Sequence, residues 1–282
     1  MSEKLKGIFF ILLSLLIFSV NSNISRAYSV NVYTMLATTT FLGVVYLGGY
    51  FVVSGQRHLF RPSQSPALLF GVAVAVLVTL ITFYSAIRLT TVANTVLLHY
   101  TAPIFTVALA VLFLKEPFEW QSIFAVLLSF AGIYLVFGGT LRPSLGLILA
   151  LASGVSYGVT IVLYKRLVSQ GSIYSLSFTV GLLLFVFVSP ALFFQLPPLS
   201  EFLIMAVLAP GVIVIAPLLY YQGLKAIQAQ HASIISYAEI LFTSFFGWLF
   251  FGEVPGQFAL LGGALIIAAG IWAVLRETRP KV

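Results

Sequence analysis

The sequence predicts an all-α integral membrane protein with ten transmembrane helices in a 5+5 inverted repeat. Composition is the first of three supporting observations. Hydrophobic residues make up 61% of the 282 residues and charged residues only 7%, with a mean hydropathy of +1.11, whereas soluble domains carry about 25% charged residues. The chain also divides into ten apolar stretches of membrane-spanning length, and its two halves each contain a version of one long stretch.

The predicted spans follow from breaking the chain at Lys, Arg, Pro and Gly clusters, since a helix needs about 20 residues to cross roughly 30 Å of hydrocarbon. They are residues 7–26, 32–53, 66–87, 91–114, 119–139, 144–164, 173–194, 201–223, 229–251 and 256–275. The loops are short, so we expect no soluble catalytic domain. The first span follows Lys4 and Lys6 as a signal peptide would, but it lacks a small-residue cleavage site, so we interpret it as an uncleaved helix.

Basic residues predict the orientation. With the N-terminus inside, only Arg26, Arg88 and Arg142 of the 14 Lys and Arg residues fall in outer loops. The positive-inside rule therefore predicts a multi-pass protein of the cytoplasmic (inner) membrane with both termini cytoplasmic. The scattered basic residues form no cluster for nucleic acid despite the net charge of +7. With no Cys and no cluster of metal ligands, we expect neither a cofactor nor a metal.

An internal repeat relates the two halves. YSAIRLTTVANTVLLHYTAPIFTVALAVLFLKE (84–116) matches YQGLKAIQAQHASIISYAEILFTSFFGWLFFGE (221–253) at an offset of 137, so that Tyr100 corresponds to Tyr237. Each half holds five predicted helices, so the predicted repeats, 1–141 and 142–282, lie in opposite orientations. Inverted repeats are typical of alternating-access transporters, whose substrate site lies near the bilayer midplane.

With these stretches, the short loops and FSVNSNISR (18–26), the whole chain resembles the drug/metabolite transporter superfamily, most closely its EamA-type repeat. The resemblance implies transport of a small organic compound: relatives export amino acids, drugs and other metabolites, and some import. This sequence departs from the family pattern in two places. The second helix, TMLATTTFLGVVYL (34–47), offers only Thr where the family usually has Arg, and helix nine has Ile240 where the family has the counterpart of Pro103. A kink in helix nine is therefore in doubt.

Glu239 is the central candidate residue. Ser233, Ser236, Glu239 and Thr243 share one face of helix nine, and a polar face at membrane depth indicates a cavity or a protein partner. Because burial disfavours the charged form of a carboxylate, Glu239 could exchange protons near neutral pH or bind a substrate amine. The alternative is a neutral Glu with a structural hydrogen bond.

Helix four holds the corresponding half of the predicted site. Thr95 and His99 lie on one helical face, and His99 is either a second proton-coupling candidate, a hydrogen-bond donor to substrate, or a structural histidine. Pro103 predicts a bend, because proline removes a backbone hydrogen bond.

The other substrate-binding candidates are polar or aromatic residues of helices one, three, six and eight. They are Asn21, Asn23, Tyr84, Tyr157 and Gln222. Glu116 and Glu253 end helices four and nine, where their depth favours capping or gating.

The sequence thus predicts a secondary active transporter that moves a small organic metabolite outward, such as an amino acid or another amphipathic amine, with proton coupling through Glu239. Its expected partners are that substrate, protons and the lipid bilayer; the oligomeric state is open. The alternatives are an intramembrane enzyme or lipid-handling protein, or an importer of another metabolite or drug class. An enzyme would need several converging acids, His or Lys near one interface.

Overall fold

The computed structural model describes residues 2–24, 28–90, 92–137, 144–252, 254 and 256–278, which form helices and no strands. The α-helices are α1 (Glu3–Ile24), α2 (Val32–Val53), α3 (Pro66–Leu89), α4 (Val92–His99), α5 (Ala102–Leu109), α6 (Trp120–Phe137), α7 (Leu145–Val168), α8 (Ile173–Val188), α9 (Leu199–Ala209), α10 (Ala216–Ala226), α11 (Ala229–Ile235), α12 (Ala238–Phe251) and α13 (Gln257–Thr278). Short 3₁₀ and π segments extend or join them: η2 (Arg57–Phe60), η3 (Ala110–Leu114), η4 (Ser189–Phe193) and η5 (Pro210–Ile215).

The all-α membrane fold is confirmed. Among the described residues, eight helical segments are long and apolar enough to cross a bilayer, the last two being Leu199–Ala226 and Ala229–Phe251. The expected fifth and tenth spans are shorter apolar helices, Trp120–Leu135 in α6 and Leu260–Leu275 in α13. The number of ten crossings therefore stays a prediction. Helices suit this environment because they satisfy their backbone hydrogen bonds internally.

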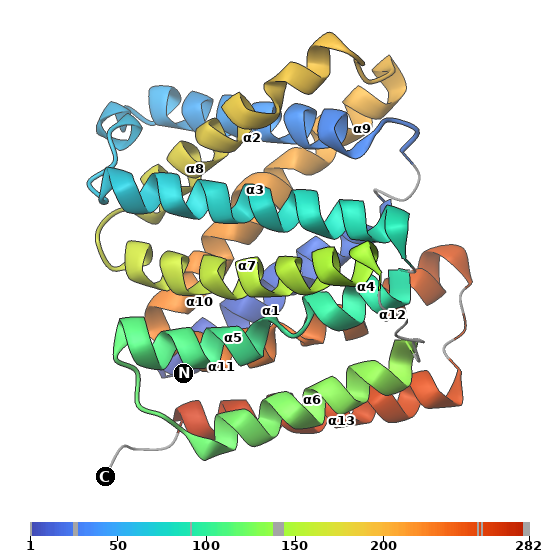
Figure 1. The fold of residues 1–282 in the computed structure, drawn as a ribbon. Helices are drawn as coiled ribbons and strands as arrows, with labels where there is room; N and C mark the ends of the chain where they lie inside the picture. Colours follow the sequence, from blue (N-terminus) through green and yellow to red (C-terminus); the bar gives the residue numbers. More distant parts are fainter. Residues whose placement is uncertain are drawn as a thin grey trace.

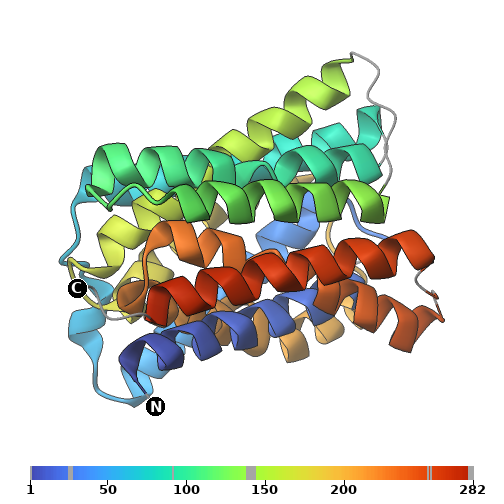
Figure 2. The same ribbon diagram turned by 90° about the horizontal axis from the view of Figure 1, so that it is seen from below.

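Helices of the first half of the chain pack against helices of the second half. α3 packs along α7, and α10 packs along α1. α2 pairs with α8, and α6 pairs with α13 at the lower edge of the bundle in Figure 1. Seen from below, α6 and α13 run side by side along their length (Figure 2). α4 and α5 also pack against α7, so each of these helices of the first half contacts a helix of the second half.

Local signals fix where helices begin and end. Asn31 caps α2 by accepting a hydrogen bond from the Thr34 N–H at 3.0 Å, and Ser144 caps α7 by accepting from the Leu147 N–H. Gly252 ends α12 in the left-handed conformation with φ 67°. The first turn of α1 and the last turn of α13 lie at one end of the bundle, which we call the terminal face, since Lys4 Nζ is 3.1 Å from Glu277 Oε1.

The fourth predicted span is broken, as Pro103 predicts. α4 ends at His99 and α5 begins at Ala102. In the gap the Thr101 N–H donates to the Leu98 carbonyl at 3.1 Å, which is the tighter bonding of a 3₁₀ turn.

The ninth span is also broken, and here the doubt raised by Ile240 was wrong. α11 ends at Ile235 and α12 begins at Ala238, with no proline nearby. The Tyr237 N–H donates to the Ile234 carbonyl at 3.2 Å, again across three residues, and Ser236 Oγ donates to the Ala232 carbonyl. Serine hydroxyls that bond back to the preceding turn often bend helices, and the break in the second half thus forms without a proline.

Candidate functional site

The two helix breaks meet each other inside the bundle. The aromatic rings of Tyr100 and Tyr237 are 5.8 Å apart, and Tyr237 Oη donates a hydrogen bond to the Tyr100 carbonyl oxygen at 2.9 Å. These two residues are the counterparts found in the sequence repeat. The breaks therefore form one internal junction that joins the two halves of the chain.

Glu239 lies in the first turn of α12, beside this junction. Its carboxylate Oε2 accepts a hydrogen bond from Tyr100 Oη at 3.4 Å, and its backbone carbonyl accepts one from Ser19 Oγ of α1 at 3.2 Å. The hydroxyls of Tyr157 and Tyr220 lie near this carboxylate. The positive end of the α12 dipole favours a negative charge at this position.

His99 ends α4 next to the same junction. Its ring stacks on Tyr157, with centroids 5.0 Å apart and planes 18° apart, and Phe83 packs edge-on against it. Nδ1 lies 3.1 Å from Ser153 Oγ, and that hydroxyl donates its hydrogen to the Ala150 carbonyl. Nδ1 therefore carries a hydrogen and donates to Ser153, which leaves Nε2 to accept a hydrogen bond when the ring is neutral.

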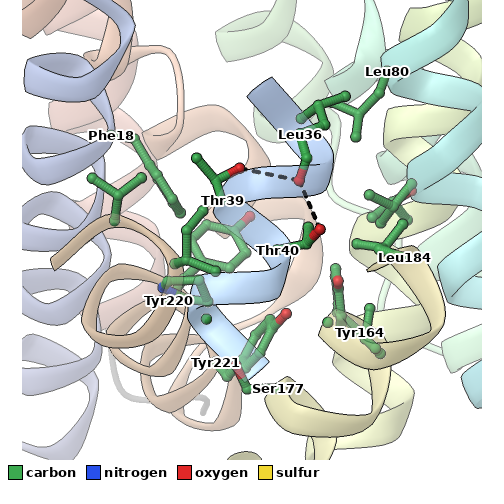
Figure 3. Close-up of a pocket in the computed structure, with 18 of the residues that line it drawn as sticks. Phe18, Leu36, Thr39, Thr40, Leu80, Tyr164, Ser177, Leu184, Tyr220 and Tyr221 are labelled. Atoms are coloured by element: carbon green, nitrogen blue, oxygen red, sulfur yellow. Dashed lines mark hydrogen bonds between the residues drawn. The ribbon is translucent and has the colours of Figure 1, made fainter. Parts of the chain in front are cut away.

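The bundle also contains a largely apolar cavity, which Tyr157 and Tyr220 line and Glu239 and His99 do not. It has a volume of about 360 Å³ and is enclosed by α1, α2, α3, α7, α8 and the η5–α10 segment. Its aromatic lining consists of Phe18, Tyr157, Tyr164, Phe178, Tyr220 and Tyr221. Among the described residues, no Lys, Arg, His, Asp or Glu lines it. We call this space the aromatic cavity (Figure 3).

Hydroxyl groups supply the polar points of the aromatic cavity. Thr39 and Thr40 both donate to the Leu36 carbonyl in their own helix, α2, as the dashed lines in Figure 3 show. Thr160 of α7 likewise donates to the Ser156 carbonyl. Because these hydrogens are engaged, the threonine oxygens offer the cavity only lone pairs. The threonines therefore present acceptors, whereas the tyrosine and Ser177 hydroxyls of the lining can also donate.

The predicted site residues divide into three groups by position. Tyr157 lines the aromatic cavity, whereas Glu239 and His99 lie next to Tyr157 but do not line the cavity. Ser236 is buried and bonds to its own helix, and Thr95 is fully buried on α4.

The remaining candidates do not line the aromatic cavity. Asn23 is buried and ties two helices together, since Nδ2 donates to the Ser19 carbonyl of α1 and the Thr243 carbonyl of α12. Asn21 and Tyr84 are half-buried, and Gln222 is exposed on α10. We therefore do not carry Gln222 into the site proposed below.

Sequence reasoning missed part of the cavity wall. Thr39, Thr40, Ser177 and Tyr220 line the cavity without having been singled out. A usable signal was the run of three threonines at 38–40 inside an otherwise apolar span. Lipid cannot satisfy so many hydroxyls, which points to an internal face.

A polar network closes the terminal face. Buried His231 lies between two carboxylates: Nδ1 is 2.6 Å from Glu277 Oε2, and Nε2 is 3.2 Å from Glu119 Oε2. Glu277 also pairs with Lys4 and accepts a hydrogen bond from the Gln228 N–H. We call these residues the terminal-face network. It joins α1, α11, α13 and the segment before α6.

Glu116 extends this network as a helix cap. Its carboxylate accepts hydrogen bonds from the Ala229 N–H at 2.8 Å and the Gln230 N–H at 3.4 Å, at the start of α11. Glu116 thus caps the start of α11, a helix of the other half of the chain, and its predicted role at the end of its own helix, by capping or gating, stays a prediction. Glu253, its counterpart, lies outside the described residues. His231 was not selected from the sequence, because its partners come from distant segments.

Comparison with known proteins indicates the kind of molecule. The sequence matches the EamA-like transporter family twice, over residues 5–138 and 144–276. It is 30% identical over 225 residues to an uncharacterized transporter of Archaeoglobus fulgidus, with 78% of this chain and 80% of that protein covered. A Rickettsia bellii protein named an S-adenosylmethionine uptake transporter is 23% identical over 292 residues, with 99% and 98% covered.

The fold also has a close counterpart among solved structures. One crystal structure superimposes with a TM-score of 0.82 at 19% sequence identity, covering 96% of this chain and 97% of the other. Identity at that level speaks for the fold alone.

Proposed function

The chain belongs to the EamA-like transporter family, and from that premise we propose that it is a secondary active transporter that exports a small organic metabolite bearing an amine. The observation that carries the proposal is the aromatic cavity, enclosed by helices from both halves of the chain. A largely apolar pocket with a few placed polar groups is the usual form of a small-molecule site.

The lining of the cavity supports a cationic or amine-bearing substrate. Aromatic faces attract ammonium groups through their negative ring faces, and the threonine oxygens can accept hydrogen bonds from such a group. An anionic group would find neither Lys nor Arg among the described lining residues. Phe18, Tyr164 and Tyr220 also offer apolar surface to the rest of the molecule. Amines that carry large apolar groups fit this chemistry, and the carboxylate of an amino acid would have only the tyrosine and Ser177 hydroxyls as donors.

Alternating access is supported by the symmetric packing between helices of the two repeats. α3 packs on α7 as α10 packs on α1, which is the arrangement expected when repeats 1–141 and 142–282 are related by a two-fold axis in the membrane plane. Rocking one repeat against the other would open and close the two ends in turn. The terminal-face network, which joins both halves, would close one end, and we propose that this end faces the cytoplasm of an inner membrane.

Glu239 is our candidate for proton coupling. It is the carboxylate beside the junction of the two helix breaks, and its hydrogen-bond partner Tyr100 lies on the opposite repeat. Tyr157 and Tyr220 lie near Glu239 and also line the aromatic cavity. Substrate that displaces these tyrosines would change the surroundings of Glu239. Proton uptake from outside would then alternate with substrate release, giving export.

Uptake of a sulfonium compound is the second candidate. The relative from Rickettsia bellii is named for S-adenosylmethionine uptake, and a sulfonium is an organic cation that aromatic faces attract as they attract an ammonium. It differs from the first candidate in direction and substrate, while the cavity is the same. Both candidates therefore belong in one experiment.

The test uses the purified protein in proteoliposomes with an imposed pH gradient. Radiolabelled amino acids, amines and S-adenosylmethionine are offered in turn, and the recovered compound is checked for chemical change, which would indicate an enzyme. We expect an amine to move against its gradient when protons move the opposite way. Accumulation driven by a proton entering with the substrate would indicate uptake instead.

The variant Glu239→Gln separates coupling from binding. We expect it to keep substrate exchange between the two sides and to lose the effect of pH. Glu3→Gln is the matched control, because Glu3 is an exposed carboxylate that pairs with Lys6 at the start of α1. Transport by Glu239→Gln that responds to pH as wild type does would overturn the role of Glu239 but leave the cavity proposal intact.

A further inference from the structure

A second cavity opens at the terminal face, away from the aromatic cavity. It has a volume of about 940 Å³ and lies between the end of η3, the last turn of α7 and the last turn of α10. Four cationic side chains line it against a single carboxylate. They are Lys115, Lys165, Arg166 and Lys225, with Glu116 as the carboxylate. We call this space the basic pocket.

Two of these charges already have partners. Lys165 donates hydrogen bonds to the carbonyls of Leu224 and Ile227 at the end of α10. Glu116 accepts from the backbone N–H groups that begin α11. Both residues therefore serve the structure, and Glu116 has little capacity left to neutralise the other cations.

The other three cations are exposed and unneutralised. Lys115 follows η3 in the left-handed conformation with φ 56°, Arg166 lies in the last turn of α7, and Lys225 lies in the last turn of α10. Within the described part of the chain none of them has an acidic partner. Cations complement the dipole of a helix C-terminus, which explains why each of these residues lies at the end of a helix. The dipole does not explain why three of them line one cavity.

We propose that the basic pocket binds a phosphate-bearing anion, taken from the headgroup of an anionic phospholipid or from a soluble phosphate ester. Guanidinium and ammonium groups around one cavity can each donate to different oxygens of a phosphate, and Arg does so in a bidentate way. Basic pockets at the ends of membrane helices recognise lipid headgroups by this chemistry. The site lies outside the aromatic cavity, so it is an accessory site and does not depend on the identity of the transported substrate.

The apolar rim favours a lipid as the source. Phe113, at the end of η3, lines the pocket and is 62% exposed, and neighbouring Leu112 is 71% exposed. A phospholipid would place its headgroup among Lys115, Arg166 and Lys225 and its chains beside these two residues. A soluble phosphate ester would use only the cations.

The experiment measures binding by the full-length protein in detergent through its melting temperature. One arm adds phosphatidylglycerol, with phosphatidylcholine for comparison; the other adds inorganic phosphate, with chloride at equal ionic strength. We expect phosphatidylglycerol to raise the melting temperature in a saturable way. A shift with inorganic phosphate as well would identify the phosphate group itself as sufficient, and a shift with phosphatidylglycerol alone would identify a lipid site.

The double variant Arg166→Gln/Lys225→Gln tests the pocket, since both side chains are exposed and neither holds the fold. We expect its apparent affinity for phosphatidylglycerol to fall at least about tenfold, because two charge-assisted hydrogen bonds are lost. Arg57→Gln/Arg61→Gln is the control, with two equally exposed basic residues around η2 that do not line the pocket. An equal loss in the control, or no preference of wild type for either phosphate-bearing probe, would overturn the proposal.

Discussion

Tyr237 Oη donates a hydrogen bond to the Tyr100 carbonyl oxygen across the two halves of the chain. The Tyr100 carbonyl needs this donor because the helix is interrupted there: Pro103 has no N–H, and the Ile104 N–H binds the Thr101 carbonyl. A residue of one repeat thus completes the backbone bonding of its own counterpart in the other repeat. This bond holds the two breaks together beside Glu239.

Tyr237→Phe should therefore destabilise the protein. The ring packing survives, but a buried carbonyl loses its donor, which costs about 1–3 kcal/mol. Thermal unfolding in detergent should show a lower melting temperature than wild type. Tyr134→Phe is the matched control, because the Tyr134 side chain is half exposed on α6. Equal melting temperatures for Tyr237→Phe and wild type would show that the bond contributes nothing.

Gly154 of α7 lets that helix approach the first break closely. A Cβ at this position would lie 2.6 Å from the Leu98 carbonyl oxygen and 2.9 Å from the His99 carbonyl oxygen. These are backbone atoms, which cannot move without shifting the helix.

Gly154→Ala should cost about 1–3 kcal/mol through overpacking, measured by thermal unfolding. Gly71→Ala on α3 is the control, since no atom lies within 4 Å of its Cβ. There the better helix propensity of Ala should leave the protein as stable as wild type or more so. Should both variants behave alike, close packing of α7 on the break would not be the reason for Gly154.

Much of the fold follows from local sequence. Apolar runs of about 20 residues predict helix bounds such as Val32–Val53, and Pro103 predicts the first break. The second break could not be foreseen, because no proline marks it and a hydroxyl that bonds back as Ser236 does also occurs within an unbroken helix, at Thr38 of α2. The local sequence pattern also cannot predict which polar residues line the cavity and which lie deeper among the helices. Glu239 lies behind the tyrosines, while Thr39 and Thr40, from a span that offers no charge, line the cavity itself.

Long-range partners were likewise beyond the sequence. His231 meets Glu119 and Glu277 from segments 112 and 46 residues away. No spacing rule relates such positions, since the fold alone brings them together.

The terminal-face network should make stability depend on pH. Burial by itself would raise the pKa of Glu277, but the hydrogen bonds from His231, the Gln228 N–H and Lys4, with the charge of His231, lower it below its ordinary value of 4.5. A carboxylate with a lowered pKa contributes stability above its ordinary pKa, and this is lost as the pH falls through the lowered one. Wild type should thus melt above Glu277→Gln at neutral pH, and the difference should vanish in acid.

Glu116 provides a comparison of opposite sign. Burial raises the pKa of Glu116, more than its two backbone hydrogen bonds, Lys165 and His231 lower it. Its stabilising contribution is therefore present in acid and is lost as the pH rises through the raised pKa. The melting temperature of wild type minus that of Glu116→Gln should fall with rising pH, where the difference for Glu277→Gln rises. Parallel trends for the two variants would contradict this account of the network.

The substrate site can be tested by filling the aromatic cavity. Gly181 of α8 lines it, and the nearest atom to a Cβ placed there is Val44 Cγ2 at an ordinary 3.8 Å. The Cβ of Gly181→Leu should thus fit without a clash, and we expect the rest of the side chain to occupy space in the cavity. We expect unfolding to change by less than about 1 kcal/mol and transport of the amine to fall at least about tenfold. Gly71→Leu adds the same side chain outside the cavity and should transport normally. A folded Gly181→Leu protein that transports at the wild-type rate would place the substrate elsewhere, and the search would return to the space between Glu239 and His99.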